Sequence, residues 1–341
     1  MNLLLTGVTG FVGRNLLLKL LEQAEYETIY VPVRSADKFR AQLQGDGFDE
    51  IPSRVKPVEL SAPHWDFSSL PAIDHVVHSA GTIFASSREE YFKTNVDGTL
   101  TLLRTIQLSP QSRTILLSSQ AAAGPCANGH ARDEGHTEAP VTFYGESKLE
   151  MEKKVTSEFG PRLVERPFLF LRPPMVFGPR DQATLALFKM ARSPVRVKPG
   201  NKPKYFSYIA VSDLVEAILS ALKAPSWDGL AGKAFFVASE EPVTDEKLIT
   251  LCGEAQKRRG LLLKIPHPVL WGVSQVVERV PKWRNEIPNL TKDRVREIWP
   301  ERWVCSADSF AKGFRWKPRE ELTKTLQLTR DWYVKTGKLP A

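Results

Sequence analysis

The chain has 341 residues, of which 42% are hydrophobic and 25% charged, a balance typical of a globular protein with one or two domains. Its net charge of +8 favours an anionic ligand or surface, but the scattered basic residues and the lack of a binding motif argue against a nucleic-acid partner. No apolar run predicts a membrane-spanning helix or a signal peptide, and three widely separated cysteines (Cys126, Cys252, Cys305) predict a reducing, cytoplasmic setting without disulfides or a metal site.

The first half of the chain alternates short apolar runs with helical patterns. Strands are expected at residues 2–7, 28–34, 75–81, 113–120 and 167–174, and helices at 11–24, 90–107 and 144–159. Repeated β-α-β units with continuous apolar strands are typical of a parallel sheet that helices cover on both faces. The sequence therefore predicts an α/β fold with a doubly wound Rossmann sheet.

The pattern loosens after about residue 180, where prolines multiply. A strand followed by a helix is expected over 205–222 and another strand over 233–239, while residues from 261 onward look helical with breaks at proline. We expect a smaller, mostly helical C-terminal substrate domain. The predicted boundaries are 1–171 and 203–238 for the Rossmann domain, and 172–202 and 239–341 for the substrate domain.

A glycine-rich loop, "TGVTGFVG", follows the first strand and opens the first helix. Gly7 would make the tight turn, Gly10 would let backbone amides approach a pyrophosphate, and Gly13 would let the helix pack on the sheet. The pyrophosphate would then lie at the positive end of the helix. A glycine-rich turn without a ligand is the alternative, but the strand-turn-helix context favours a dinucleotide site.

The second strand ends at Arg34, where an NAD-selective site usually has an acidic residue that binds the adenosine ribose. A guanidinium at this place would pair with a 2′-phosphate, and Lys38 follows one turn further on. A solvated arginine at a strand end is the alternative. We predict NADP as the cofactor, with NAD as the second choice.

Tyr144 and Lys148 lie four positions apart where a helix is expected to begin. Residues at i and i+4 share one helix face, so the two side chains can meet. They are either a catalytic pair or neighbours on a solvated face. Their spacing alone does not decide between these interpretations.

Together with the glycine loop, the segments "HSAG", "TNVDGT", "LLSSQAAAG", "YGESK" and "LRPPMVFGPRD" resemble, in order and spacing, the extended short-chain dehydrogenase/reductase family. The resemblance covers most of the chain. It implies that a serine, Tyr144 and Lys148 form a catalytic trio and that Asn95 supports the active-site backbone. It also implies a cofactor site, in which Glu59 departs from the usual Asp, made of Gly7, Thr9, Gly10, Phe11, Val12, Gly13, Arg34, Glu59, Leu60, Ala80, Gly81, Tyr144, Lys148, Pro173 and Val176.

The resemblance implies that Tyr144 gives a proton to a carbonyl, or takes one from an alcohol, while hydride moves to or from the nicotinamide. A free phenol has a pKa near ~10, which is too high for a general base at neutral pH. We expect the Lys148 ammonium to lower the pKa of Tyr144 by about 3 units, which corresponds to roughly 4 kcal/mol. Lys148 would also hold the nicotinamide ribose.

Two serines compete for the third catalytic place. Ser118 and Ser119 stand at the end of a strand and point to opposite faces of the sheet. The family's serine or threonine usually lies five residues before the glycine of this segment, which is Gly124 here. This count selects Ser119 to bind the substrate oxygen and leaves Ser118 as a small residue for close packing.

The substrate is expected to be apolar. Sugar-nucleotide members of the family commonly have an Arg-Asp pair where this chain has Phe206 and Ser207, although four cations could rebuild a phosphate site: Arg180, Arg196, Lys198 and Lys204. The segment "SSQAAAGP" more closely resembles the dihydroflavonol reductase and 3β-hydroxysteroid dehydrogenase branch. We predict an NADP(H)-linked enzyme for a ketone or secondary alcohol, with a pocket lined by Phe143, Met175, Phe177 and Trp271.

Other interpretations stay open at this stage. The chain could be a nucleotide-sugar epimerase or dehydratase that retains its NAD, an acyl-thioester reductase, or a non-enzymatic NADP-binding protein, which the complete trio disfavours. Residues 261–280 form either a helix that roofs the substrate pocket or one that lies on a membrane surface. The sequence is compatible with a monomer or a homodimer.

Overall fold

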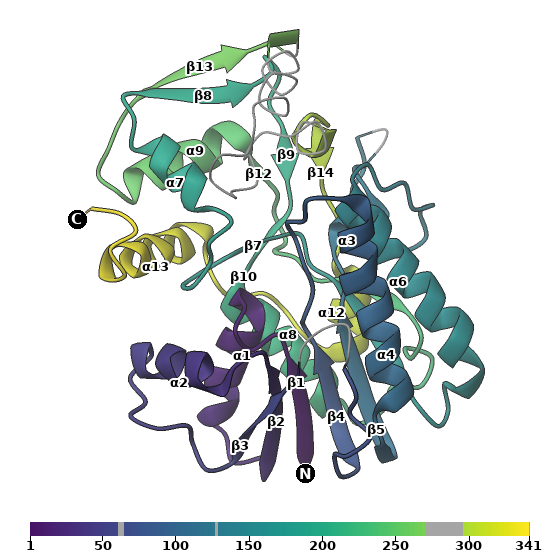
Figure 1. Cartoon of the computed structure of the whole chain (residues 1–341). Helices are drawn as coiled ribbons and strands as arrows, with labels where there is room; N and C mark the ends of the chain where they lie inside the picture. Colours follow the sequence, from purple (N-terminus) through teal and green to yellow (C-terminus); the bar gives the residue numbers. More distant parts are fainter. Residues whose placement is uncertain (61–64, 127–128, 267, 270–295, 341) are drawn as a thin grey trace.

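The computed structural model describes residues 1–60, 65–126, 129–266, 268–269 and 296–340 (Figure 1). A parallel sheet of seven strands runs through the described residues in the order β3-β2-β1-β4-β5-β6-β11. Its strands are β1 (Asn2–Thr6), β2 (Thr28–Val33), β3 (Val55–Glu59), β4 (Ile73–His78), β5 (Leu108–Leu117), β6 (Phe168–Arg172) and β11 (Ala234–Phe236). The strand order reverses between β1 and β4, which confirms the predicted Rossmann sheet.

Helices cover both faces of the sheet because alternate residues of its strands are apolar on both sides. Leu3 and Leu5 of β1 belong to one buried cluster and Leu4 to the other. The first cluster is completed by α1 (Phe11–Leu21), α2 (Ala36–Gly45), α8 (Val211–Lys223) and α12 (Asp308–Phe314). The second is completed by α3 (Arg88–Phe92), α4 (Gly98–Thr105) and α6 (Phe143–Phe159).

The predicted helix over 90–107 is interrupted. A π-helical turn, Lys93–Asp97, separates α3 from α4 and holds Asn95 and Val96 buried. Such single turns often occur at functional sites, because they turn a side chain inward that a regular helix would direct elsewhere. The interruption therefore marks Asn95 as a residue whose orientation matters.

The C-terminal part combines helices with small sheets and lies above the carboxyl ends of the main strands (Figure 1). Its helices are α7 (Leu185–Ala191), α9 (Asp245–Glu254) and α13 (Leu322–Lys335). Three small sheets pair β7 (Met175–Phe177) with β10 (Tyr208–Ala210), β8 (Val195–Pro199) with β13 (Leu261–Ile265), and β9 (Tyr205–Phe206) with β12 (Val243–Thr244) and β14 (Arg302–Trp303). Strands thus contribute more to this part than the sequence indicated.

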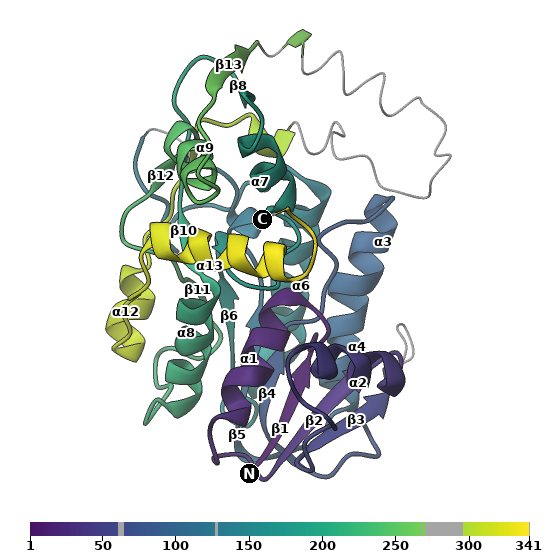
Figure 2. The same ribbon diagram turned by 90° about the vertical axis from the view of Figure 1, so that its left-hand side faces the viewer.

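One prediction for the C-terminal part needs correction. The helix expected to begin at Leu261 is wrong over Leu261–Ile265, because pairing with β8 makes this segment a strand; residues 270–280, including Trp271, lie outside the described residues. The boundary that assigns 239–341 to the substrate domain stays a prediction, although one helix beyond residue 239 packs with the main sheet. Phe310, Phe314 and Trp316 pack in the cluster of α1 and α8, so α12 belongs with the main sheet (Figure 2).

Candidate active site

The predicted site residues lie at one edge of the main sheet. The glycine loop follows β1, Arg34 follows β2, Glu59 and Leu60 end β3, Ala80 follows β4, and Ser119 follows β5. The strands are parallel, so their carboxyl ends meet at the same edge. The reversal of strand order between β1 and β4 opens this edge to a ligand.

The glycine loop has the geometry of an anion site. Gly7 has a φ of +76°, and a side chain there would collide with the backbone of Ser79 and Ala80 at 2.7 Å. The amide of Gly10 donates to the Gly7 carbonyl at 2.9 Å, and α1 begins at the next residue without a side-chain cap or an acidic residue in its first turn. These uncapped amides at the positive helix end fit a pyrophosphate.

The adenosine end of the site contains both a cation and an anion. Arg34 is exposed and forms no ion pair or hydrogen bond with another described residue. The carboxylate of Glu59 accepts a hydrogen bond from the Ala36 amide at 2.6 Å, at the start of α2, where Ser35 is the N-cap. Glu59 therefore stabilises the start of α2 and adds negative charge close to Arg34, a feature that the motif comparison did not predict.

A buried hydrogen-bonded chain supports the nicotinamide end. The Thr6 hydroxyl bonds to Nδ1 of His78 at 2.8 Å, and Nε2 of His78 bonds to the Thr99 hydroxyl at 3.0 Å. The Thr99 hydroxyl donates in turn to the Asn95 carbonyl at 2.8 Å. Burial lowers the pKa of His78 to about 3, so the ring is neutral at physiological pH and acts as a fixed connector. The sequence showed His78 merely as a strand residue.

Asn95 joins three segments of the site. Its Oδ1 accepts from the Thr82 amide at 2.9 Å, and its Nδ2 donates to the Thr82 carbonyl and to the Ser147 hydroxyl. A methyl group at Gly81 would lie 2.9 Å from Asn95 Oδ1 and 3.2 Å from Lys148 Nζ. These distances place Asn95, Gly81 and Lys148 close together, while their roles stay predictions.

Ser119 and Tyr144 meet because α5 (Gln120–Ala123) and α6 approach each other closely. Gly145 permits this approach, since a side chain there would collide with the Ala121 carbonyl at 2.4 Å. The Ser119 hydroxyl is close enough to the Tyr144 phenol to lower its pKa, and Ser119 Oγ accepts a hydrogen bond from the Ala121 amide at 3.1 Å. Ser118 is 4% exposed and lies inside the packing, and the choice of Ser119 as the catalytic serine stays a prediction.

The pKa of Tyr144 differs from the value expected from the sequence. Burial raises the pKa of Tyr144 to about 12, although the nearby Ser119 hydroxyl lowers it in part. Burial also lowers the pKa of Lys148 to about 8, and its Nζ donates to the Leu117 carbonyl at 2.8 Å. The predicted fall in the phenol pKa is therefore wrong for the protein alone, because loss of hydration outweighs the other influences on the phenol.

One aromatic ring stands beside the phenol and contacts a loop that carries two exposed apolar residues. The Tyr91 ring lies 6.2 Å from the Tyr144 ring, and its hydroxyl donates to the Ile83 carbonyl. Ile83 and Phe84 are 51% and 49% exposed on the loop that follows β4. The sequence motifs did not point to Tyr91, Ile83 or Phe84, although two adjacent apolar residues in a loop after a strand are a usable signal.

The remaining predictions have mixed outcomes. Pro173 and Val176 flank the turn from β6 into β7, and the Pro173 carbonyl accepts from the Gln120 amide beside Ser119. Phe177 is fully buried among the residues of the C-terminal core, so its place in a substrate pocket is wrong. Met175 is half-buried at the edge of that core, and Phe143 is half-buried at the start of α6.

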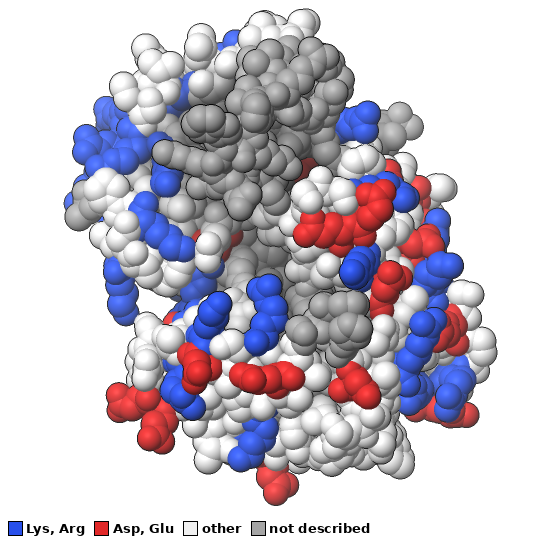
Figure 3. Space-filling model, viewed as in Figure 1, with Lys and Arg blue, Asp and Glu red and all other residues white. Residues whose placement is uncertain are grey.

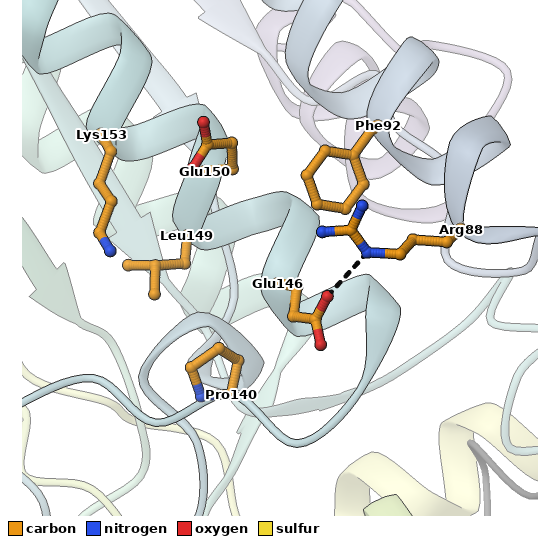
Figure 4. A pocket seen from close by; sticks show the side chains of 7 residues that line it. All are labelled: Arg88, Phe92, Pro140, Glu146, Leu149, Glu150 and Lys153. Atoms are coloured by element: carbon orange, nitrogen blue, oxygen red, sulfur yellow. Dashed lines mark hydrogen bonds and ion pairs between the residues drawn. The ribbon is translucent and has the colours of Figure 1, made fainter.

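A groove of about 410 Å³ lies on a different face of α6 (Figure 4). Arg88, Phe92, Pro140, Glu146, Leu149, Glu150 and Lys153 line it, and Arg88 pairs with Glu146 at 3.0 Å. Since successive helical residues are about 100° apart, Glu146, Glu150 and Lys153 point away from the face that carries Tyr144 and Lys148. The groove is therefore separate from the candidate active site.

Comparison with known proteins agrees with this geometry. The NAD dependent epimerase/dehydratase family matches residues 3–237. A ceramide reductase of Caulobacter vibrioides is 23% identical over 337 residues, covering 98% of this chain and 95% of the relative. A decarboxylating sterol-4-alpha-carboxylate 3-dehydrogenase of Candida albicans is 27% identical over 277 residues, covering 76% of each.

The crystal structure of a UDP-glucuronic acid 4-epimerase from Bacillus cereus in complex with NAD has the same fold, with a TM-score of 0.76, 18% identity and coverage of 98% of this chain and 99% of the other. The family match covers more than half of the chain and includes every strand of the main sheet. The chain therefore belongs to the NAD dependent epimerase/dehydratase family and is an enzyme of the extended short-chain dehydrogenase/reductase type that uses a nicotinamide dinucleotide.

Proposed function

We propose that the enzyme transfers hydride between NADPH and a ketone or secondary alcohol on an apolar substrate. The observation that carries the proposal is the cluster of the Ser119 hydroxyl, the Tyr144 phenol and the buried Lys148 ammonium at the carboxyl edge of the sheet. The bound nicotinamide would supply or accept the hydride. The residues of the chain would bind the substrate oxygen and move its proton.

The proposed proton donor is the Tyr144 phenol. With a pKa raised to about 12, it is protonated at neutral pH, which favours donation to a carbonyl oxygen as the carbonyl carbon receives hydride. The Ser119 hydroxyl would orient the same oxygen. Lys148 has buried N–H groups beyond the one that the Leu117 carbonyl accepts, and these would bind ribose hydroxyls.

An apolar substrate fits the side chains beside the phenol. Ile83 and Phe84 expose apolar surface next to Tyr91, and a hydrocarbon that covers them gains about 25 cal/mol per Å² buried. Phe206 and Ser207 offer no replacement for a diphosphate clamp. Phe206 packs against the C-terminal core, and the Ser207 hydroxyl is buried against the backbone of Cys305.

The four cations that could have rebuilt a phosphate site are engaged within the protein. Arg180 pairs with Asp46 at 2.8 Å, and Lys198 pairs with Asp245 at 2.9 Å. Arg196 donates to the Arg258 carbonyl, and Lys204 donates to the carbonyls of Ile298 and Trp299. An unpaired diphosphate near Phe206 would lose hydration without compensating charge, which costs several kcal/mol. This argues against the nucleotide-sugar alternative.

The names of two relatives point the same way, since a ceramide reductase and a sterol dehydrogenase act on lipids by name. Arg34 supports the choice of NADPH over NADH. The three free cysteines fit the proposed cytoplasmic location. Apart from α12, the predicted domain boundaries are kept as part of this proposal, and the choice between a monomer and a homodimer stays a prediction.

The test is NADPH consumption by the purified protein with long-chain ketones, steroid ketones, acyl thioesters and nucleotide sugars. We expect turnover of an apolar ketone, and with deuterium on the nicotinamide C4 the carbinol carbon of the product gains one deuterium. Tyr144→Phe should lower kcat about 10²–10⁴-fold without weakening NADPH binding. The control is Tyr91→Phe, a substitution at a neighbouring tyrosine, which should keep most of the activity. Turnover restricted to nucleotide sugars, or full activity of Tyr144→Phe, would contradict the proposal.

A further inference from the structure

The small sheet of β8 and β13 has one apolar face. The two strands are parallel with Leu261 opposite Val195, Leu263 opposite Val197 and Ile265 opposite Pro199. Because side chains alternate along a strand, these six residues share one face, here called the β8–β13 face. Leu261 is 79% exposed, Leu263 54% and Val195 50%. An apolar face with this exposure is uncommon on a protein surface unless it binds something.

The other face of the same sheet fixes its orientation. Arg196 is buried against Gly253 at the end of α9 and donates to the Arg258 carbonyl at 2.8 Å. Lys198 is fully buried and pairs with Asp245 at 2.9 Å and Glu246 at 3.4 Å. These polar contacts hold the charged side of the sheet against α9, so the apolar side faces away from that helix. Figures 1 and 2 show the two strands at one end of the molecule.

Basic residues stand directly beside the β8–β13 face. Lys257, Arg258 and Arg259 are consecutive and exposed in the loop that leads from α9 into β13, and the nearest acidic residue in sequence is Glu254. Figure 3 shows blue side chains gathered at the upper left, where this loop runs, with no red ones among the coloured residues there. Lys264 on the opposite face is neutralised by Glu246 at 3.3 Å.

We propose that the β8–β13 face docks on an anionic lipid bilayer, with its apolar side chains at the level of the acyl chains and the three basic residues against lipid phosphates. A protein partner could cover an apolar face, but the adjacent unneutralised positive charge matches the negative surface of such a membrane. Within the described residues no helix is long and apolar enough to span a bilayer. Attachment would therefore be peripheral, and it does not depend on which carbonyl compound the active site reduces.

The experiment is co-sedimentation of the full chain with vesicles of phosphatidylcholine alone and of equal parts phosphatidylcholine and phosphatidylglycerol. We expect binding to the anionic vesicles that weakens at high salt. Leu261→Glu/Leu263→Glu and Arg258→Ser/Arg259→Ser should each reduce the partition coefficient at least about tenfold. The controls are Val164→Glu, which alters another exposed apolar residue, and Lys153→Ser/Lys154→Ser, which removes two charges from α6; both should bind as the wild type does.

Thermal unfolding of the same variants separates docking from packing. The proposal expects Leu261→Glu/Leu263→Glu to unfold near the wild-type temperature, since the face is exposed. A large fall in unfolding temperature with unchanged vesicle binding would mean that the protein itself covers this face, and would overturn the proposal. Failure of the wild type to bind anionic vesicles would overturn it as well.

Discussion

Three lysines are buried among the described residues, Lys148 at the sheet edge and Lys198 and Lys204 in the C-terminal part. The surroundings of Lys148 and Lys198 differ most clearly. Lys148 donates to a backbone carbonyl, and among the described residues no carboxylate lies within ion-pair distance of its ammonium. The carboxylate that raises the pKa of Lys148, Glu152, accepts hydrogen bonds from Nε and Nη2 of Arg172 at 3.0 and 2.5 Å. Lys198 instead contacts two carboxylates, those of Asp245 and Glu246.

The difference separates a lysine that would bind a ligand from a lysine that stabilises the folded protein. A buried ammonium without a carboxylate is costly to the folded state, and here its pKa falls to about 8. Such a group is retained where a ligand uses its charge and donors. A lysine neutralised by two carboxylates has little to offer a phosphate. We therefore propose that the sheet edge is the reactive region. The pKa of Lys204 also falls to about 8, but its ammonium donates to the carbonyls of Ile298 and Trp299 and so joins two segments of the C-terminal part.

Lys198→Met is expected to have the largest effect on stability. It leaves Asp245 buried and unpaired, which typically costs about 3–5 kcal/mol. Denaturant unfolding of the variant would measure this loss. Catalysis by the protein that remains folded at low temperature should be unchanged, because Lys198 lies outside the active site. Loss of activity at unchanged stability would place Lys198 in the reactive region instead.

Lys148→Met is expected to raise the free energy of unfolding, in contrast to Lys198→Met. The folded pKa of about 8 lies below the ordinary 10.5, so the charged form costs about 3 kcal/mol below pH 8, and this cost disappears as the pH rises through about 10.5. The variant also loses the hydrogen bond to the Leu117 carbonyl, and this loss offsets about 1–2 kcal/mol of the gain from removing the charge.

At neutral pH we thus expect Lys148→Met to be about 1–2 kcal/mol more stable than the wild type and nearly inactive. The gain should shrink in alkaline buffer, which thermal unfolding across a pH series would reveal. A variant that is less stable than the wild type at neutral pH would contradict the contrast between the two lysines.

The two serines offer a smaller comparison inside the sheet edge itself. Ser119→Ala removes the hydroxyl beside the Tyr144 phenol that would bind the substrate oxygen. It should lower kcat about tenfold to a hundredfold, the value of a hydrogen bond to a group that develops charge. Ser118→Ala removes a buried hydroxyl that has no partner among the described residues, and activity should be kept. Steady-state kinetics of both variants decides; a worse defect in Ser118→Ala would reverse their assignment.

The smallest expected effect concerns cofactor choice. Arg34→Ala should weaken the binding of NADPH several-fold and leave the binding of NADH nearly unchanged. The reason is that the 2′-phosphate is the group that distinguishes the two cofactors. Glu59→Gln should improve NADPH binding, since it removes a negative charge at the start of α2 while an amide oxygen can still accept from Ala36. Titrations with both cofactors test this, and equal or tighter binding of NADH by the wild type would refute the preference.

Local motifs in a parallel sheet explain what could be predicted from the sequence. The glycine loop, Ala80, Ser119 and Tyr144 each follow a recognisable strand or open a helix, and parallel strands bring their carboxyl ends together whatever the details of packing. The placement of the glycine loop and Ser119 at the same edge of the sheet follows from this rule.

Properties that depend on distant neighbours were not predictable in the same way. The pKa of Tyr144 is set by burial in the folded protein, and Glu59 is fixed by the amide of Ala36, 23 residues away in the chain. The strand at Leu261–Ile265 forms because Val195–Pro199 lies alongside it, although its own sequence resembles a helix. Phe177 shows the same limit, since a core position and a pocket position look alike in sequence.

The most direct test of the account is calorimetry of nucleotide diphosphates and nucleotide sugars with the enzyme saturated with NADPH. If the cations of the C-terminal part are engaged as described, none of these compounds binds at micromolar concentration, whereas an apolar ketone that is turned over does. Micromolar binding of a nucleotide sugar, competitive with the ketone rather than with NADPH, would contradict the account.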